Sequence, residues 1–239
     1  MDYPDYDFRA GALLPLDKPA GWTSFDVVNF IRFRLRRLTG VKRIKVGHSG
    51  TLDPMATGLL LIATGKATKR LTELTALPKS YTGTMRFGES TASYDAETEV
   101  IGRFPTAHLS AEGLREIVRE RFVGVVEQRP PLFSAIKVDG KRAYKSARAG
   151  EAVELPTRTV TVSRFELTRV ALPEVDFAVD VSKGTYVRSL AHDLGAAAGS
   201  GAHLTALRRT AIGPYALADA YATEEFAAHL DRLADAAGS

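Results

Sequence analysis

The chain has 239 residues, of which 45% are hydrophobic and 25% charged, a balance typical of a globular protein with enough apolar side chains for a core. It contains no cysteine, which excludes a disulfide framework, a cysteine-ligated zinc site and a thiol nucleophile. The net charge of +4 is unevenly divided, because residues 214–239 carry five acids and one strong base, net −4, and residues 1–213 therefore carry +8.

The first third of the chain predicts a short strand over residues 13–16, a helix, and a glycine-rich loop over residues 46–58. Thr23-Ser24 with Asp26 marks the helix start, and Gly40 suits its end. Between them, apolar residues recur at helical spacing: Phe25, Val28, Ile31, Leu35 and Leu38. A buried segment over residues 59–63 and a helix over 67–77 follow.

The remainder of the chain predicts an irregular alternation of strands and helices. Strands are expected over residues 81–87, 133–138, 160–162, 175–181 and 203–209. Helices are expected after Ser110, from Gly184 to Ala198 and from Thr223, with a polar loop over 88–96 and a turn at Asp139-Gly140. This order predicts an α+β fold with a mixed or antiparallel sheet. Without an internal repeat or a Ser/Gly linker, one compact domain is favoured.

Basic residues are clustered along the chain. The densest stretch, residues 32–45, contains seven bases and no acid, and smaller sets lie around residues 129–148 and 183–209. Clustered bases favour binding to a phosphate backbone, although a solvated basic face has the same pattern. The acidic first residues and the short longest apolar run, residues 59–63, predict neither a signal peptide nor a membrane span, so a cytoplasmic protein is expected.

Common cofactor motifs are missing. No G-x-G-x-x-G follows a predicted strand. Gly65-Lys66 resembles the end of a phosphate-binding loop, but Leu60 stands at the first glycine position and Ala67 at the hydroxyl position. The five histidines have no H-E-x-x-H spacing, and no carboxylate cluster suggests magnesium. We therefore predict no cofactor and no metal.

The loop GHSGTLDP holds one carboxylate, that of Asp53, between glycines and a proline. Such a carboxylate serves as a covalent nucleophile, a general base or a turn cap. Turn statistics alone favour the turn cap.

The longer string GHSGTLDPMATGLLLIATGKATK resembles the signature of the TruB family of pseudouridine synthases, G-H-[ST]-G-x-L-D-P-x-A-x-G-x-L. Further similar segments follow in the family's order: LLPLDKPAGWTSFDVV, KSYTGTMRFG, PPLFSAIKVDGKRAYKSARAG, SKGTYVRSLAHDLG and GAHLTALRRTAIGPY. The resemblance covers residues 11–220.

The resemblance implies the pseudouridine synthase fold, with a mixed, mostly antiparallel sheet, flanking helices and a central RNA-binding cleft. It implies isomerisation of the T-loop uridine of tRNA, in which uracil leaves its N1 link and rejoins the same ribose through C5 without a cofactor. We expect a single catalytic domain over residues 1–239, with a core over 10–220, an acidic tail over 221–239 and no PUA domain. The partner is the T-arm of tRNA, and we expect a monomer without an obligatory protein partner or membrane.

The resemblance assigns catalytic roles to Asp53, Tyr81 and Arg188. Asp53 matches the family's catalytic aspartate, Tyr81 the tyrosine that packs on the target base, and Arg188 the arginine that pairs with the aspartate. The alternatives from the residues alone are a turn cap for Asp53, an apolar strand position for Tyr81 and a surface phosphate contact for Arg188.

Further residues match substrate-binding positions. His48 matches the signature histidine that helps bases to flip out, with a structural loop histidine as the alternative. Tyr186 and Leu207 match the base pocket, where Leu207 is equally a core residue. Lys18 is expected to support the active-site loops or to contact RNA. Lys137, with Arg142 and Lys145, falls in the family's RNA-facing middle region or on a solvated face.

Two other functions remain open. One is a guide-RNA-dependent subunit of the dyskerin type, which shares the signature. The other is a tRNA-binding folding factor whose catalysis matters little, against which the set Asp53, Tyr81 and Arg188 weighs.

Overall fold

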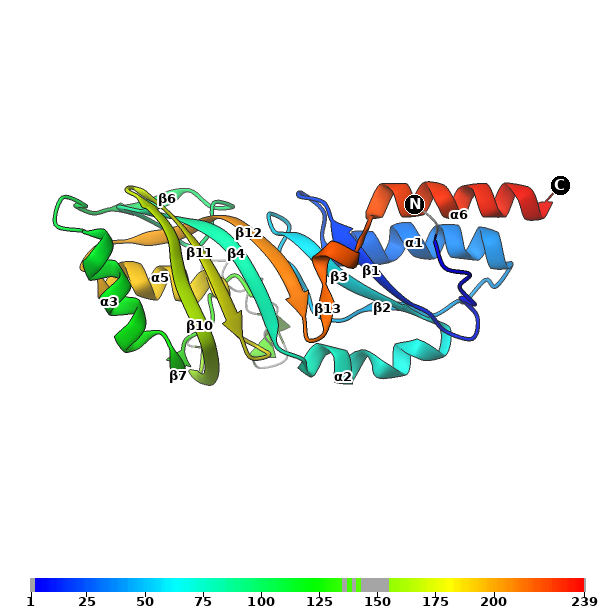
Figure 1. Cartoon of the computed structure of the whole chain (residues 1–239), viewed down its shortest axis with the longest axis horizontal. Coiled ribbons are helices and arrows are strands. Elements are labelled where there is room, and N and C mark those ends of the chain that lie inside the picture. The colour runs from blue at the N-terminus through cyan, green and yellow to red at the C-terminus, as the bar shows by residue number, and fades with distance from the viewer. Residues whose placement is uncertain (1–2, 135–136, 139–140, 143–154, 239) are drawn as a thin grey trace. The chain divides into compact units, whose positions relative to one another are not determined.

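The computed structural model describes residues 3–134, 137–138, 141–142 and 155–238 (Figure 1). The chain forms two compact units. Unit 1 comprises Met1–Lys79 and Arg208–Ser239, and unit 2 comprises Ser80–Leu207. The chain enters unit 2 at the start of one strand and returns to unit 1 near the middle of another. The single catalytic domain expected from the sequence stays a prediction.

Unit 1 contains a small mixed sheet. Its strands are β1 (Leu13–Lys18), β2 (Val46–His48), β3 (Thr57–Thr64), the end of β12 (Ala202–Ile212), β13 (Tyr215–Ala216) and β14 (Tyr221–Ala222). β3 pairs antiparallel with β1 and β2 and parallel with β12. Leu60 and Ile62 face one apolar cluster, and Leu59 and Leu61 face another. β3 is thus apolar throughout because both its faces are covered.

Helix α1 (Ser24–Thr39) has the ends that the sequence predicts. The Thr23 side chain accepts a hydrogen bond from the backbone of Asp26, and the Asp26 carboxylate accepts one from the backbone of Thr23, which forms a capping box. Gly40 ends the helix in the left-handed region at φ 70°, where glycine is favoured. The 3₁₀ helix η1 (Gly65–Arg70) and helix α2 (Leu71–Ala76) confirm the helical segment predicted after β3.

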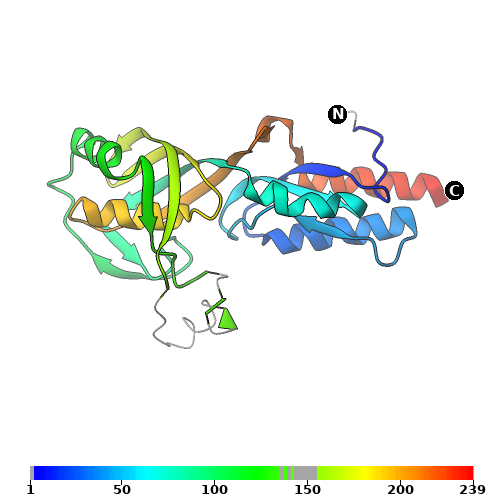
Figure 2. The same cartoon turned by 90° about the horizontal axis from the view of Figure 1, so that it is seen from below.

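Helix α6 (Thr223–Gly238) lies beside α1, as both views show (Figures 1 and 2). Its Phe226, Ala227 and Leu230 are buried in the core that also contains the inner side of α1. Arg34 of α1 donates to Asp231 at 2.9 Å, and Arg37 pairs with Asp231 and Asp235. The acidic C-terminal segment is therefore packed against the densest basic stretch.

Unit 2 contains strands in the order β12-β4-β11-β10-β7, in which β10 pairs antiparallel with both β11 and β7. The strands new to this unit are β4 (Lys79–Phe87), β7 (Gly124–Gln128), β10 (Arg158–Ala171) and β11 (Glu174–Val181). Helix α3 (Ala111–Arg121) packs on β10 and contacts α5 (Val187–Ala197). Two short pairs accompany them: β5 (Glu89–Thr91) with β6 (Val100–Arg103), and β8 (Lys137–Val138) with β9 (Lys141–Arg142).

The expected α+β class with a mixed, mostly antiparallel sheet is confirmed, but several local predictions are wrong. The loop over 46–58 contains β2 and the start of β3, and the loop over 88–96 contains β5. These short strands form only because a partner strand lies beside them, which local pattern does not reveal. Phe133 and Ser134 lie outside any strand, the helix expected from Gly184 begins at Val187, and the turn at Asp139-Gly140 lies outside the described residues. No helix in the described part of the chain is long and apolar enough to cross a membrane.

The contact between α6 and α1 predicts that Phe226→Ala lowers the free energy of unfolding by about 3–5 kcal/mol, because a fully buried ring is removed. Leu233→Ala on the same helix is the matched control, since Leu233 is 39% exposed and its loss leaves little cavity. Urea unfolding measures both variants. Equal effects at the two positions would contradict the buried packing of α6.

Candidate active site

Asp53 lies in the connection between β2 and β3, which is tied to the start of α1. The Ser24 hydroxyl accepts from the backbone N–H of Leu52 at 2.8 Å and donates to the carbonyl of Leu52 at 3.3 Å. The N–H of Ala56 donates to the carbonyl of Asp53 at 3.0 Å. The backbone on either side of the carboxylate is thus fixed within unit 1.

Lys18 supports this loop from within the protein. Its side chain is fully buried, and its ammonium donates to the carbonyls of Pro19 at 2.9 Å, Trp22 at 2.6 Å and Pro54 at 3.3 Å. Pro54 directly follows Asp53, so Lys18 links β1 to the loop that contains Asp53. Of the two roles expected for Lys18, this burial favours loop support over RNA contact.

Arg209 is a second buried cation beside the loop. Its Nε donates to the carbonyl of Leu59 at 2.7 Å and its Nη2 to the carbonyl of Gly50 at 3.2 Å. Gly58 has φ 101°, and a Cβ there would lie 2.3 Å from the backbone oxygen of Arg209, so glycine is required. Sequence reasoning placed Arg209 only in a basic cluster. Strand alternation could have predicted its burial, because Leu207 and Arg209 point the same way and both are buried.

His48 ends β2 and is half-buried. Burial lowers the pKa of its imidazole, the Gly50 backbone opposes this in part, and the positive charge of Arg209 adds a smaller lowering effect. The ring is therefore neutral at pH 7. Its Nδ1 is buried without a hydrogen-bond partner among the residues that the structure describes.

Tyr81 and Leu207 lie on the neighbouring strands β4 and β12 of unit 2. Both side chains are buried. The two strands approach closely at Gly83, where a Cβ would lie 2.5 Å from the carbonyl oxygen of Ala206. The alternation of Tyr81, Gly83 and Met85 expected for a strand is confirmed.

Arg188 and Tyr186 lie at the start of α5. Arg188 is buried, and its guanidinium donates to the carbonyls of Ser93 at 2.9 Å and Phe133 at 3.1 Å. Gln128 holds the Tyr186 backbone at both polar groups, since its amide donates to the Tyr186 carbonyl at 3.0 Å and its oxygen accepts from the Tyr186 N–H at 2.7 Å. Burial contradicts a surface location for Arg188.

Asp95, a neighbour of Arg188, was not singled out from the sequence. It is fully buried, and its Oδ2 lies 3.4 Å from Nη1 of Arg188. Its Oδ1 accepts from the hydroxyl of Ser93 and from the N–H of Glu97. Asp95 lies in the segment predicted as a polar loop, where nothing in the local pattern marks one carboxylate as buried.

The half-buried residues His192 and Asp193 of α5 lie near this network. The rings of His192 and Tyr94 stack with centroids 3.8 Å apart and an interplanar angle of 10°. Tyr94 has φ 64°, an uncommon conformation for a residue other than glycine. Burial raises the pKa of Asp193 to about 6 and lowers that of His192.

Lys137 lies in β8, where it is the register partner of Arg142 in β9. Lys145 lies outside the described residues.

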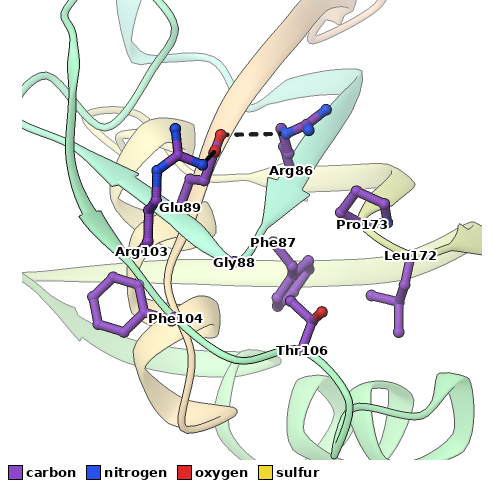
Figure 3. A pocket seen from close by; sticks show the side chains of 9 residues that line it. All are labelled: Arg86, Phe87, Gly88, Glu89, Arg103, Phe104, Thr106, Leu172 and Pro173. Atoms are coloured by element: carbon purple, nitrogen blue, oxygen red, sulfur yellow. Dashed lines mark hydrogen bonds and ion pairs between the residues drawn. The ribbon is translucent and has the colours of Figure 1, made fainter.

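A shallow pocket of about 400 Å³ in unit 2 contains none of the predicted site residues (Figure 3). Glu89 in its lining pairs with Arg86 at 3.3 Å and Arg103 at 2.7 Å, so the two arginines there are already partnered.

The structure therefore gathers the predicted residues in two groups. Lys18, His48 and Asp53 surround one loop in unit 1. Tyr81, Tyr186, Arg188 and Leu207 lie in unit 2, on two neighbouring strands and at one helix start.

Two family models together match residues 36–237 of the chain. The model of the TruB family pseudouridylate synthase N-terminal domain matches residues 36–187, and that of the tRNA pseudouridylate synthase B C-terminal domain matches residues 188–237. The chain belongs to the TruB family of pseudouridylate synthases.

Curated relatives are named tRNA pseudouridine synthase B. That of Flavobacterium johnsoniae is 53% identical over 87% of this chain and 91% of its own length. That of Phocaeicola vulgatus is 50% identical over 95% of this chain and 96% of its own length. The relative from Thermobifida fusca is 50% identical over 92% of this chain and 75% of its own length.

Solved structures show the same fold. A Cbf5-Nop10-Gar1 complex matches with a TM-score of 0.65 and 32% identity over 87% of this chain and 50% of that chain. An H/ACA RNP bound to a substrate RNA matches with a TM-score of 0.66 and 27% identity over 92% of this chain and 53% of that chain. This chain spans about half the length of these two relatives.

The raised pKa of Asp193 predicts a pH-dependent effect of Asp193→Asn on stability. The folded state holds this proton more tightly than the unfolded chain, so the contribution of Asp193 to folding is full below about pH 4 and is lost as the pH rises through about 6. We expect Asp193→Asn to raise the unfolding temperature at pH 8 and to leave it unchanged near pH 4. Thermal unfolding with the exposed Asp219→Asn as control measures this, and an equal shift at both pH values would contradict it.

Proposed function

We propose that this protein isomerises the T-loop uridine of tRNA to pseudouridine. The observation that carries this proposal is the identity of about half of all aligned residues with relatives named tRNA pseudouridine synthase B, over nearly the whole chain. The fixed loop around Asp53 supports it, because the reaction requires a carboxylate at a defined position.

The chemistry rearranges one nucleotide. The bond between uracil N1 and ribose C1′ breaks, the base turns, a bond forms between C5 and C1′, and the C5 proton moves to solvent while N1 gains one. No atom is gained or lost and nothing is oxidised, so the stoichiometry requires no cofactor and no metal.

In this proposal the Asp53 carboxylate acts on the ribose or uracil of a flipped-out nucleotide, by attack at C1′ or by a glycal route. The ring of Tyr81 stacks on the target base, and its hydroxyl relays a proton. Arg188 keeps the catalytic carboxylate ionised and oriented. Tyr186 and Leu207 line the base pocket, and a neutral His48 stacks where a base has left the T-loop.

We infer that the protein acts alone, as a monomer in the cytoplasm, on the T-arm of tRNA. The structural relatives include RNA-protein complexes with several subunits, which keeps a guide-RNA-dependent subunit as the second candidate. The higher identity of the relatives named for tRNA favours the unguided reaction. An unmodified tRNA transcript incubated with the purified protein alone separates the two, because a guide-dependent subunit forms no product there.

Asp53→Asn is expected to reduce pseudouridine formation to background while tRNA affinity stays within about threefold of wild type, because the amide keeps the shape but loses the charge. Mapping of pseudouridine in the treated transcript and filter binding measure the two properties. Asp219→Asn is the control for loss of an exposed carboxylate. Product formation at the wild-type rate would disprove the role of Asp53.

An isolated T-arm stem-loop is expected to be modified at the same uridine as whole tRNA, because the proposed contacts are confined to that arm. Single-turnover rates on the two RNAs test this expectation. Activity on whole tRNA together with none on the stem-loop would rule out recognition of the T-arm alone.

A further inference from the structure

Helix α1 has three faces that follow from about 3.6 residues per turn. The inner face is buried in the core of unit 1 and contains Val27, Val28, Ile31 and Leu35. A second face carries Arg34 and Arg37, whose charges are paired with α6. The remaining arc, about 100° wide, carries Phe25, Asn29, Arg32, Phe33 and Arg36, and we call it the outer face of α1.

The outer face presents two aromatic rings to solvent. Phe25 is 59% exposed and Phe33 is 68% exposed. Phe33 lies eight positions after Phe25, which is about 12 Å along the helix at 1.5 Å per residue. Polar side chains lie between the rings, so they do not form the continuous apolar patch that a protein interface of this kind would use.

The charge of the outer face is positive. The Cζ atom of Arg32 lies 5.9 Å from the centroid of the Phe25 ring, and its guanidinium donates to Asn29 and to the carbonyl of Val46. Arg36 is exposed and has no ion pair among the described residues. Asp26, the one acid of α1, is engaged in the capping box.

The positive charge continues past the end of the helix. The side chains of Lys42, Arg43 and Lys45 are exposed and form no ion pair within the described part of the chain. Half-exposed arginine beside exposed aromatic rings is the combination that binds RNA, since guanidinium groups contact phosphates and rings stack on unpaired bases.

We propose that the outer face of α1 is a second RNA-binding surface, outside the residues assigned to catalysis. Arg32 and Arg36 contact phosphates, and Phe33 and Phe25 each stack on an unpaired base. The proposal rests on the proposed function in that the RNA is the tRNA substrate. RNA is the occupant that this surface fits, because an excess of cations interleaved with separated rings complements a polyanion with exposed bases.

The start of this surface adjoins the catalytic loop. Phe25 follows Ser24, whose hydroxyl holds the backbone of Leu52, the residue before Asp53. The outer face then leads away from the loop along the helix. An RNA segment with one nucleotide at Asp53 therefore reaches Phe25 first and Phe33 further along.

Binding of a labelled tRNA transcript to Arg36→Glu, Phe33→Ala and the double variant tests the surface. Arg36→Glu is expected to weaken binding and to reduce the slope of log K against log salt by about 1. Phe33→Ala is expected to weaken binding of tRNA about tenfold and to leave binding of a fully paired RNA duplex nearly unchanged, because a duplex offers no free base. Arg115→Glu on the exposed side of α3 is the matched charge-reversal control and is expected to bind as wild type.

Wild-type affinity and wild-type salt slope in the folded double variant would overturn the proposal, with thermal unfolding as the check of folding. So would a change in oligomeric state, measured by light scattering, without a change in RNA affinity, because the face would then bind a second copy of the chain. The proposed function would be contradicted by a different result, the absence of pseudouridine in tRNA treated with the wild-type protein. The affinity measurements test RNA binding by the outer face of α1 whether or not pseudouridine forms.

Discussion

The position of Asp53 depends on two buried cations that hold the backbone of its loop. Lys18 donates to the carbonyl of Pro54, and Arg209 donates to the carbonyl of Gly50. A buried charge is costly unless its hydrogen bonds are made, so each cation imposes the loop conformation that supplies its carbonyl partners. The glycine-rich loop is thereby fixed, together with its buried residues Leu52 and Ala56.

Helix α1 connects this loop to the rest of unit 1. Its first residue holds Leu52, its inner face forms the core with β1 and β3, and its second face pairs with the acids of α6. The uneven charge of the chain thus has a structural meaning. Part of the basic stretch is neutralised by the C-terminal helix, and only the remainder is available to a polyanion.

Buried charge also positions Arg188 in unit 2, where the partner of the cation is a carboxylate as well as backbone carbonyls. A buried carboxylate, Asp95, lies beside the buried guanidinium, and hydrogen bonds from Ser93 and Glu97 fix that carboxylate in turn. The stacked rings of Tyr94 and His192 pack next to this network. An arginine held in this way is fixed in one orientation and does not turn towards solvent, which suits a role in a defined site.

Features that depend on neighbouring residues were predictable from the sequence. The capping box of α1, the glycine at its end and the buried β3 follow from local pattern, because caps, turns and periodicity act over a few residues. The role predicted for Asp53 rests instead on the resemblance to the TruB signature, because turn statistics alone favour a turn cap. The structure was needed to reveal the partners of Lys18, the burial of Arg209 and Asp95, the short strands β2 and β5, and the packing of α6 on α1. These depend on contacts between residues far apart in the chain, where a lysine, an arginine or an aspartate looks the same whether it ends in solvent or in the core.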